Sequence, residues 1–220
     1  MQPDLIIRTN RRSMSITISK DGRVIVRAPK KLGIDRILSF VNEKERWINK
    51  HLETLKKTTL LNSDVRNHEA YLLFGKKFQP HKINGLKKIE LSTTDILYPA
   101  SWDDEILNAK INKFYKQTAA KVLADRLEYF AQLMQLEYKS FKVRDYKSRW
   151  GCCSRQADII LNYRVIMLPH KLIDYIIIHE LSHILEFNHS KEFYHIVACV
   201  MPDYKTYQKQ LKDYSYLLQM

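Results

Sequence analysis

Short runs of alternating apolar and polar residues open the chain, and this period of two predicts strands. The first three predicted strands are Leu5–Arg8, Ser15–Ser19 and Arg23–Arg27. Asp21 and Gly22 separate the second strand from the third and form a strong two-residue hairpin signal. The pattern therefore predicts that these two strands pair as a hairpin.

A period of three to four replaces the alternation between Ile34 and about Lys57, and predicts one helix there. A polar connector is expected from about Thr58 to His68. Further short strands are then expected at Tyr71–Phe74, Lys77–Ile83, Lys88–Ser92 and Ile96–Tyr98. Residues 1–100 are therefore expected to form an N-terminal β-rich region with a single helix at about 34–57.

Residues 101–220 show longer helical patterns. One helix is predicted from about Asp103 to Gln135, because an apolar stripe runs through it without glycine or proline. Two strand-like segments follow, Phe141–Tyr146 and Asp158–Asn162. Three helical segments are expected to close the chain: Ile173–Phe187, Ser190 to about Met201, and about Tyr204–Leu218. This order of strands and helices is typical of the α+β class, with residues 101–220 as a second domain.

The segment Ile173–Phe187 contains the motif His179-Glu180-Leu181-Ser182-His183. Two histidines four positions apart on a helix lie on the same face and can bind one metal ion together. A glutamate beside the first histidine can take a proton from water that the metal activates. The helix is apolar on nearly every side and is expected to be buried, where these polar residues need partners. The motif therefore predicts a metal-dependent hydrolase with Glu180 as its catalytic base.

His189, ten positions after His179, is the expected third metal ligand. The helix must end before His189 and the chain must bend back; Asn188 suits that bend, because asparagine tolerates the left-handed conformation. Ser190 is expected to cap the next helix. Three histidines with an open position for water are a catalytic zinc arrangement, so zinc is the expected metal. Three neighbouring residues are alternatives for the third ligand: Glu186, Glu192 and His195.

The segment from Ser148 to Ser154 contains a tryptophan, a glycine and two adjacent cysteines just ahead of the metal motif. One interpretation is a sheet edge near the metal to which a substrate peptide adds as a strand. A second is that Cys152 or Cys153 approaches the metal, since thiolates bind zinc well. The lack of a C-x-x-C spacing favours a third, a tight turn with inert small side chains. Four residues are candidates for stabilising the oxyanion of the reaction: Arg149, Tyr163, Tyr175 and Tyr194.

Composition narrows the partners and the compartment. The chain has 220 residues, 45% hydrophobic and 28% charged, as in soluble globular proteins, and no apolar run is long enough to span a membrane. Its N-terminus lacks the pattern of a signal peptide and its three cysteines suggest no disulfide framework, so a cytoplasmic location is expected. The net charge of +13 is uneven, with 20 − 10 = +10 in residues 1–100 and 17 − 14 = +3 in residues 101–220. A basic N-terminal half suggests a nucleic-acid partner, against the alternative of a solvated lysine-rich surface.

Taken together, these motifs resemble the YgjP-like family of metal-dependent hydrolases, which is related to the SprT and WLM zinc peptidases of zincin type. The matching C-terminal motifs are Ser148-Arg149-Trp150-Gly151-x-Cys153-Ser154, Asn162-Tyr163-Arg164, the histidine motif and Asn188-His189-Ser190. The N-terminal ones are Arg11-Arg12, Ala28-Pro29, Trp47-Ile48 and Gly75-Lys76, so the resemblance covers nearly the whole chain. Cys152 and Tyr194 depart from the serine and tryptophan usual in the family.

The resemblance implies a zincin-like catalytic domain with zinc as cofactor, metal ligands His179, His183 and His189, and Glu180 as the base. It also implies peptide or protein substrates in a prokaryotic cytoplasm; the substrate-binding residues stay unknown. One alternative is an SprT-like protease that acts on DNA-associated proteins, with which the positive charge is compatible. Another is a non-enzymatic, zinc-stabilised nucleic-acid-binding module, against which Glu180 argues, because a structural zinc site is closed and needs no base.

Overall fold

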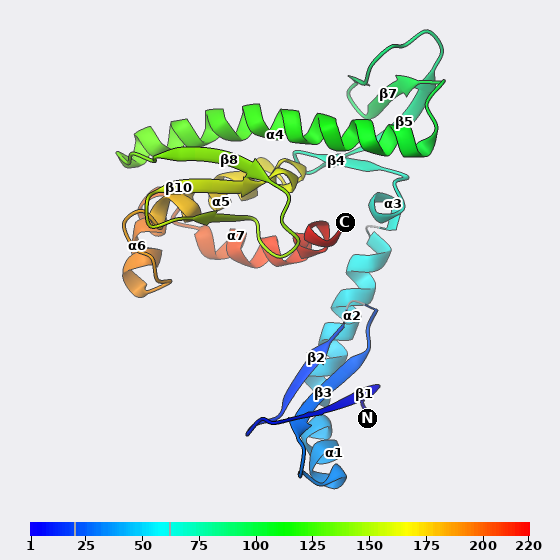
Figure 1. Cartoon of the computed structure of the whole chain (residues 1–220), viewed down its shortest axis with the longest axis vertical. Helices are drawn as coiled ribbons and strands as arrows, with labels where there is room; N and C mark the ends of the chain where they lie inside the picture. Colours follow the sequence, from blue (N-terminus) through cyan, green and yellow to red (C-terminus); the bar gives the residue numbers. More distant parts are fainter. Residues whose placement is uncertain (20, 62) are drawn as a thin grey trace. The chain divides into compact units, whose positions relative to one another are not determined.

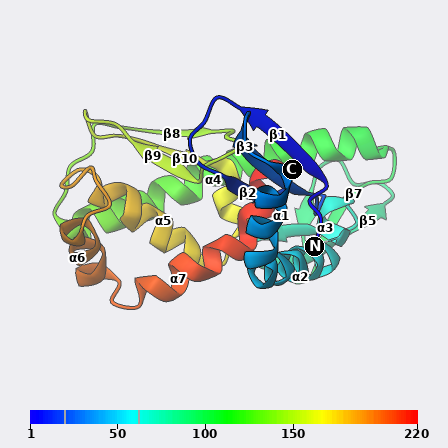
Figure 2. The same ribbon diagram turned by 90° about the horizontal axis from the view of Figure 1, so that it is seen from below.

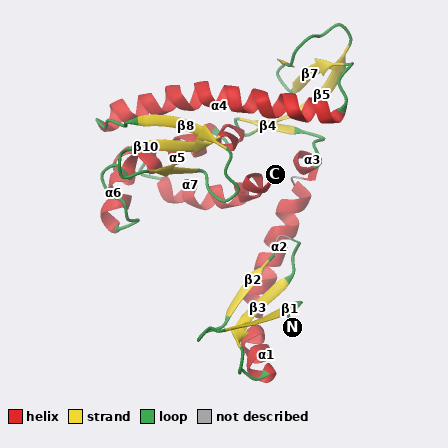
Figure 3. Cartoon of the chain, in the orientation of Figure 1, coloured by secondary structure: helices red, strands yellow, loops and turns green. Residues whose placement is uncertain are grey.

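The computed structural model describes residues 1–19, 21–61 and 63–220, and the chain divides into two compact units, Met1–Ser63 and Asp64–Met220. Both units contain helices and strands (Figure 3), so the chain is α+β as expected. The division differs from the expected boundary near residue 100. The reason is that the strands between residues 71 and 99 share a core with the second unit, and the N–H of Phe74 donates to the carbonyl of Ile166 at 2.7 Å.

In the first unit, a three-stranded sheet of order β1-β3-β2 packs against helices. Its strands are β1 (Leu5–Thr9), β2 (Ser15–Ile18) and β3 (Val24–Pro29). The central strand β3 runs parallel to β1 and antiparallel to β2, and Gly22 has a φ of 82° in the turn, so the expected hairpin is confirmed. The core of the unit combines alternate residues of β3 with apolar residues of the helices: Val24, Val26, Ala28, Ile37, Val41 and Ile48.

The single helix expected at about 34–57 is wrong, because two helices, α1 (Ile34–Glu43) and α2 (Glu45–Leu61), meet at Lys44. Lys44 leaves helical geometry with φ −99° and ψ 6°, and its N–H donates to the carbonyl of Val41 at 3.1 Å. Apolar spacing continues across the break, which explains why the pattern indicates one helix. The end of α2 and the short α3 (Ser63–Arg66) replace most of the expected connector at 58–68, of which residue 62 lies outside the described residues.

The second unit begins with a sheet of order β4-β5-β7-β6. Its strands are β4 (Tyr71–Leu73), β5 (Lys76–Ile83), β6 (Glu90–Leu91) and β7 (Asp95–Pro99). Gly75 has a φ of 77° in the turn between β4 and β5, and a Cβ atom there would lie 2.7 Å from Cγ of Pro169. The turn therefore packs tightly against the residue that precedes α5 (His170–Ser182).

Helix α4 (Asp104–Met134) is the long helix expected from the sequence, and Asp103 caps it by accepting the N–H of Ile106 at 2.8 Å. It contacts α5, the 3-10 helix η1 (Tyr163–Met167) and β8 (Ser140–Arg144). The strands β9 (Gly151–Cys153) and β10 (Asp158–Asn162) complete a sheet of order β8-β10-β9. Figures 1 and 2 show this sheet beside α4 and α5, so that β9 lies next to the helix with the histidine motif.

The chain closes with α6 (Lys191–Val200), α7 (Tyr204–Leu211) and the 3-10 helix η2 (Lys212–Gln219). The expected helical tail from Tyr204 to Leu218 is thus confirmed up to Leu211, where the helix tightens. Among the described residues, no helix has both the length and the apolar character needed to cross a membrane.

Candidate metal centre

Helix α5 places His179 and Glu180 in its last turn, inside the core of the second unit. Asp174, whose side chain is 7% exposed, accepts two hydrogen bonds from the guanidinium of Arg126 on α4, at 2.6 and 2.9 Å. A buried carboxylate needs such a partner, so this ion pair fixes α5 against α4. The helix that carries the motif is therefore held rigidly before its functional end begins.

Helix α5 ends at Ser182, and the expected continuation of a buried helix to Phe187 is wrong: Leu185 and Phe187 are exposed. The bend that follows does not use a left-handed Asn188, which is absent from the described residues with positive φ. Instead, a carboxylate oxygen of Glu186 accepts the N–H of Asn188 at 3.0 Å. A side-chain hydrogen bond thus stabilises the turn that sequence reasoning assigned to backbone conformation.

The turn brings His189 back to the two histidines of the motif. One ligand atom from each of His179, His183 and His189 lies within 4.8 Å of the others, and the Nε2 atoms of His179 and His189 are 3.1 Å apart. Two nitrogens bound to one tetrahedral zinc ion at the usual bond length would be roughly 3.3 Å apart. The three imidazoles are therefore spaced as one metal ion requires.

Hydrogen bonding and burial set the orientation and the protonation state of the imidazoles of His179 and His183. Nδ1 of His183 lies 3.0 Å from the main-chain oxygen of Glu186, which leaves Nε2 as the free ring nitrogen. Burial, and then the charges of His183 and His189, lower the pKa of His179 to about 3. Burial also lowers the pKa of His183. These two rings are neutral at pH 7, as metal ligation requires.

Phe193 of α6 packs against all three imidazoles. Its ring is fully buried, and its centroid lies 4.9 Å from that of His179, 4.5 Å from His183 and 4.9 Å from His189. Nδ1 of His179 is buried without a hydrogen-bond partner among the described residues, so packing rather than a hydrogen bond holds this side of the ring. Ser190 caps α6 as expected, accepting the N–H of Phe193 at 3.2 Å. Sequence reasoning assigned Phe193 no role at this site, because a buried aromatic residue carries no metal-binding group.

Glu180 lines the same cavity as His179 and is 6% exposed. Burial raises its pKa to about 8, against the lowering effect of the Arg149 guanidinium. A Cβ atom on Gly151 of β9 would lie 2.8 Å from Oε1 of Glu180, so only glycine leaves room for the carboxyl group in this position. Sequence reasoning missed this role of Gly151, which the glycine inside a short strand could have suggested.

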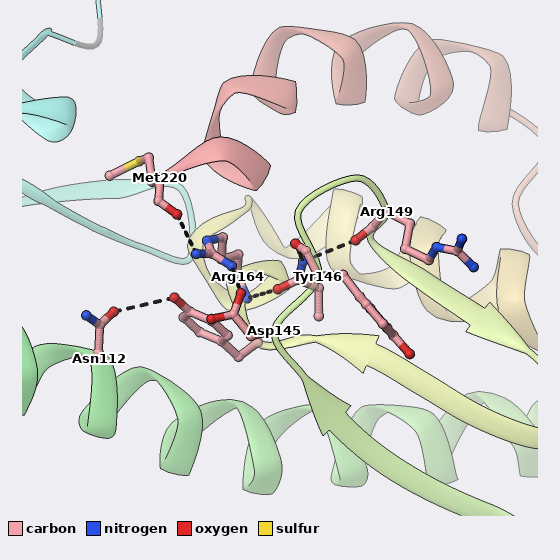
Figure 4. Close-up of polar contacts among 8 residues, drawn as sticks. Asn112, Asp145, Tyr146, Arg149, Arg164 and Met220 are labelled. Atoms are coloured by element: carbon pink, nitrogen blue, oxygen red, sulfur yellow. Dashed lines mark hydrogen bonds and ion pairs between the residues drawn. The ribbon is translucent and has the colours of Figure 1, made fainter.

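The segment Ser148–Ser154, for which a sheet edge and a tight turn were among the interpretations, contains the strand β9, which pairs antiparallel with β10 and forms an edge of its sheet. Asn162 is fully buried and donates from Nδ2 to the main-chain oxygens of Tyr146 at 2.7 Å and Arg149 at 3.1 Å (Figure 4). These hydrogen bonds hold the loop that leads into β9. A cavity of about 280 Å³ lies along this loop, lined among others by Arg149, Tyr175, His179 and Glu180.

The alternative ligands lie outside the cluster: within the described residues, the group that could hold a metal contains three histidines and no carboxylate or thiolate. Glu186 is engaged in the turn, Glu192 lies in the exposed first turn of α6, and His195 is exposed further along that helix. Cys152 and Cys153 are free and partly buried, and burial raises the pKa of the Cys153 thiol to about 11. The interpretation in which a cysteine approaches the metal gains no support from this arrangement.

The four oxyanion candidates separate in space. Arg149 and Tyr175 line the cavity beside Glu180, whereas the ring of Tyr194 stacks on that of His189 at 6.2 Å between centroids. Tyr163 lines a different cavity, with its hydroxyl 3.4 Å from Oδ1 of Asn112. Arg149, Tyr175 and Tyr194 therefore lie near the cluster and remain candidates for stabilising the oxyanion. Tyr163 lies at a different cavity and is no longer a candidate.

A cluster of three histidines, with a buried glutamate that follows the first of them in the same helix, is the arrangement of a metal-dependent hydrolase. The family model of the YgjP-like metallopeptidase domain matches residues 12–214, and the chain belongs to this family. It is therefore a metallopeptidase by family, a class of enzyme whose substrates are peptides or proteins. This confirms the resemblance noted in the sequence.

A comparison with curated proteins finds no match. Two solved structures are similar to part of the chain. One is the metallopeptidase zymogen of Pyrococcus abyssi abylysin, at 25% identity and a TM-score of 0.38 over 41% of this chain and 91% of that one. The other is the metallopeptidase zymogen of Methanocaldococcus jannaschii jannalysin, at 22% identity and a TM-score of 0.38 over 44% of this chain and 98% of that one. At these TM-scores the likeness is partial, and the family assignment rests on the family model.

Proposed function

We propose that this protein is a zinc-dependent peptidase in which His179, His183 and His189 hold the zinc ion and Glu180 is the general base. The observation that carries the proposal is the cluster of three imidazoles within 4.8 Å beside a buried carboxyl group. Neutral imidazoles with room for a further ligand are a donor set typical of catalytic zinc. On this proposal the zincin-like catalytic domain, expected at 101–220, is the second unit, Asp64–Met220.

Zinc, when bound, supplies Lewis-acid activation of water and of the scissile carbonyl. Glu180 accepts the proton from that water and returns it to the leaving amine. A pKa raised to about 8 by burial makes its carboxylate a better proton acceptor than an exposed glutamate, and a bound cation would lower that value toward neutrality. A base with a pKa near the working pH is the most effective one.

The substrate is proposed to bind as an extended peptide along β9. An edge strand presents unpaired main-chain groups, to which a peptide can add as a further strand. Tyr175 and Arg149 lie in the adjoining cavity as donors for the developing oxyanion. Burial raises the pKa of Tyr175 to about 12, which keeps its hydroxyl protonated and able to donate.

Metal analysis combined with peptide cleavage tests this function. Zinc-loaded protein is incubated with a peptide library, and cleavage is followed by mass spectrometry. Glu180→Gln should keep one zinc ion per chain and lose hydrolysis, whereas His189→Ala should lose stoichiometric zinc. His195→Ala, an exposed histidine outside the cluster, is the matched control and should behave as wild type. Wild-type cleavage by Glu180→Gln at equal zinc content would refute the role of the base.

A DNA-associated protein substrate is the second candidate, favoured by the charge of the first unit. Residues 1–63 contain 14 Lys and Arg against 6 Asp and Glu, a net charge of 14 − 6 = +8. Contacts to phosphates make binding fall steeply with salt. Fluorescence anisotropy with duplex DNA between low and physiological salt should give such a slope; no binding at low salt would remove this candidate and leave the peptidase proposal untouched.

A further inference from the structure

A groove of about 590 Å³ lies between α6 and the start of α7, which follow one another along the chain (Figure 2). Its lining residues on α6 are spaced three to four positions apart and therefore share one face of the helix: Lys191, Tyr194, His195 and Ala198. His189 lines the groove as well, and it also belongs to the histidine cluster. No residue lines both this groove and the cavity beside Glu180. The groove is thus a second wall next to the proposed metal site.

Two stacked tyrosines give the groove a fixed wall. The rings of Tyr194 and Tyr204 are 13° from parallel, and their centroids are 5.4 Å apart. Tyr204 is buried, and the hydroxyl of Tyr194 accepts a hydrogen bond from Nε2 of Gln208 at 3.1 Å. Because these contacts form within the chain itself, a ligand that packs on this wall does not have to order it first.

Lys191 of α6 and Lys205 of α7 supply positive charge at the groove. Both lysines line it and both are exposed. Neither ammonium group forms an ion pair or a hydrogen bond with another residue that the structure describes. No carboxylate is found among the described residues of the lining. Two unpaired cations without a lining anion give the groove a positive potential, which favours a negatively charged ligand.

Two carboxylates flank the groove without lining it, and each has a donor of its own. Hydrogen bonds from its own N–H and from the hydroxyl of Ser190 lower the pKa of Glu192. Asp203 is hydrogen-bonded to the side chain of Tyr207, whose pKa it raises. These partners hold both carboxylates at the helix starts, so the two lysines remain available to an incoming anion.

We propose that this groove selects peptide substrates with an acidic side chain close to the scissile bond, an inference that rests on the proposed peptidase function. Lys191 and Lys205 bind the Asp or Glu carboxylate of the substrate, and its main chain packs against Tyr194 and Tyr204. The helix rises roughly 10 Å from Lys191 to Ala198, which is the length of about three residues of extended peptide. Since His189 belongs to both the groove and the cluster, the acidic side chain lies within about three residues of the bond that is cut.

Cleavage of a pool of randomised decapeptides by the zinc-loaded full chain tests the proposal, with the products sequenced by mass spectrometry. Asp and Glu should be enriched at one position within about three residues of the cut. One cleaved peptide is then remade with Gln in place of that Glu, and kcat/KM should fall about three- to tenfold, as expected for exposed ion pairs to two lysines.

Lys191→Glu and Lys205→Glu should each bring the kcat/KM values of the Glu and Gln peptides to about the same level. A glutamate in the first turn of a helix suits the helix dipole, so both variants should fold, which circular dichroism checks. Lys113→Glu is the matched control, because it makes the same charge change at an exposed lysine of α4 outside the groove, and it should keep the wild-type preference.

Retention of the same pool on immobilised, zinc-loaded Glu180→Gln protein separates this proposal from the hydrolytic function. Acidic peptides should be enriched on this protein and not on the double variant that also carries Lys205→Glu. If no peptide is cleaved, the hydrolytic function fails, and this retention alone decides the preference.

Three results would overturn the proposal and leave the peptidase function standing. They are cleavage without enrichment of Asp or Glu near the cut, an unchanged preference in both Lys191→Glu and Lys205→Glu, and an equal loss of preference in Lys113→Glu. In the retention experiment, the absence of acidic enrichment, or enrichment that survives Lys205→Glu, would overturn it as well.

Discussion

Replacing Gly151 with alanine perturbs the position of the proposed base directly. The added Cβ atom would lie 2.8 Å from Oε1 and 2.9 Å from Cγ of Glu180, and 2.9 Å from Cδ2 of Leu161. Ordinary van der Waals contact begins at 3.4 Å, so the carboxyl group must move by about 3.4 − 2.8 = 0.6 Å, or β9 must shift by as much. Leu161 is fully buried and does not yield freely on the other side.

A misplacement of about 1 Å at a reacting group can cost roughly 100-fold in rate. For Gly151→Ala we therefore expect kcat to fall about 10- to 100-fold, or about 1.4–2.7 kcal/mol of transition-state free energy. Overpacking against Leu161 should also lower the free energy of unfolding by about 1–3 kcal/mol. Zinc content should stay at the wild-type level, because the three heavy atoms nearest the added methyl group belong to Glu180 and Leu161 and not to the histidines.

The assay is steady-state peptide cleavage by zinc-loaded protein, with zinc content and thermal unfolding measured on the same samples. Gly33→Ala is the control, since a Cβ atom there has no heavy atom within 4 Å and its φ of −61° suits alanine. A Gly151→Ala variant with wild-type kcat would refute the reasoning that glycine makes room for the base. Loss of zinc from it would show that β9 supports the metal centre instead.

Three further predictions follow from the same contacts. Arg126→Met leaves the buried carboxylate of Asp174 unpaired and should lower the free energy of unfolding by about 2–4 kcal/mol. This is less than the cost of breaking a fully buried pair, because Arg126 is 38% exposed. Equal denaturant midpoints for Arg126→Met and wild type would contradict this prediction. In metal-free protein, burial raises the pKa of Glu180 from 4.5 to about 8, so the stability that the protonated carboxyl group contributes is lost as pH rises from 4.5 to 8. Glu180→Gln should therefore unfold at a higher temperature than wild type at pH 9 and at a similar temperature at pH 4. A lower unfolding temperature of Glu180→Gln than of wild type at pH 9 would contradict this prediction. Removing the metal with a chelator should abolish cleavage, and adding back one equivalent of zinc should restore it; activity that persists in metal-free protein would exclude a metal-dependent reaction.

The part of the candidate site that sequence predicts is the part that local spacing determines. His179, Glu180 and His183 follow from helical geometry, and His189 follows from the need to bend the chain after one more turn. The structure brings the three histidines together at the expected point. The bend before His189 forms differently from the prediction. A carboxylate oxygen of Glu186 accepts the N–H of Asn188, and Asn188 does not adopt the expected left-handed conformation.

Contacts between distant segments account for what sequence reasoning missed. Gly151 matters because β9 crosses Glu180, and Asn162 matters because its amide reaches the loop before β9. Neither contact has a periodicity that could indicate it. Similarly, the unit boundary depends on hydrogen bonds from Phe74 and Gly75 to η1, which are not visible as a change in composition. The long helix α4, by contrast, follows from its cap at Asp103 and its unbroken apolar stripe.

Anomalous diffraction at the zinc edge from zinc-loaded crystals tests the central claim most directly. We predict one peak per chain, with the Nε2 atoms of His179, His183 and His189 at about 2.0–2.1 Å and the carboxyl group of Glu180 beside the metal but outside its ligand set. A peak bound by a carboxylate or a thiolate in place of His189, or by Glu180 itself, would contradict it.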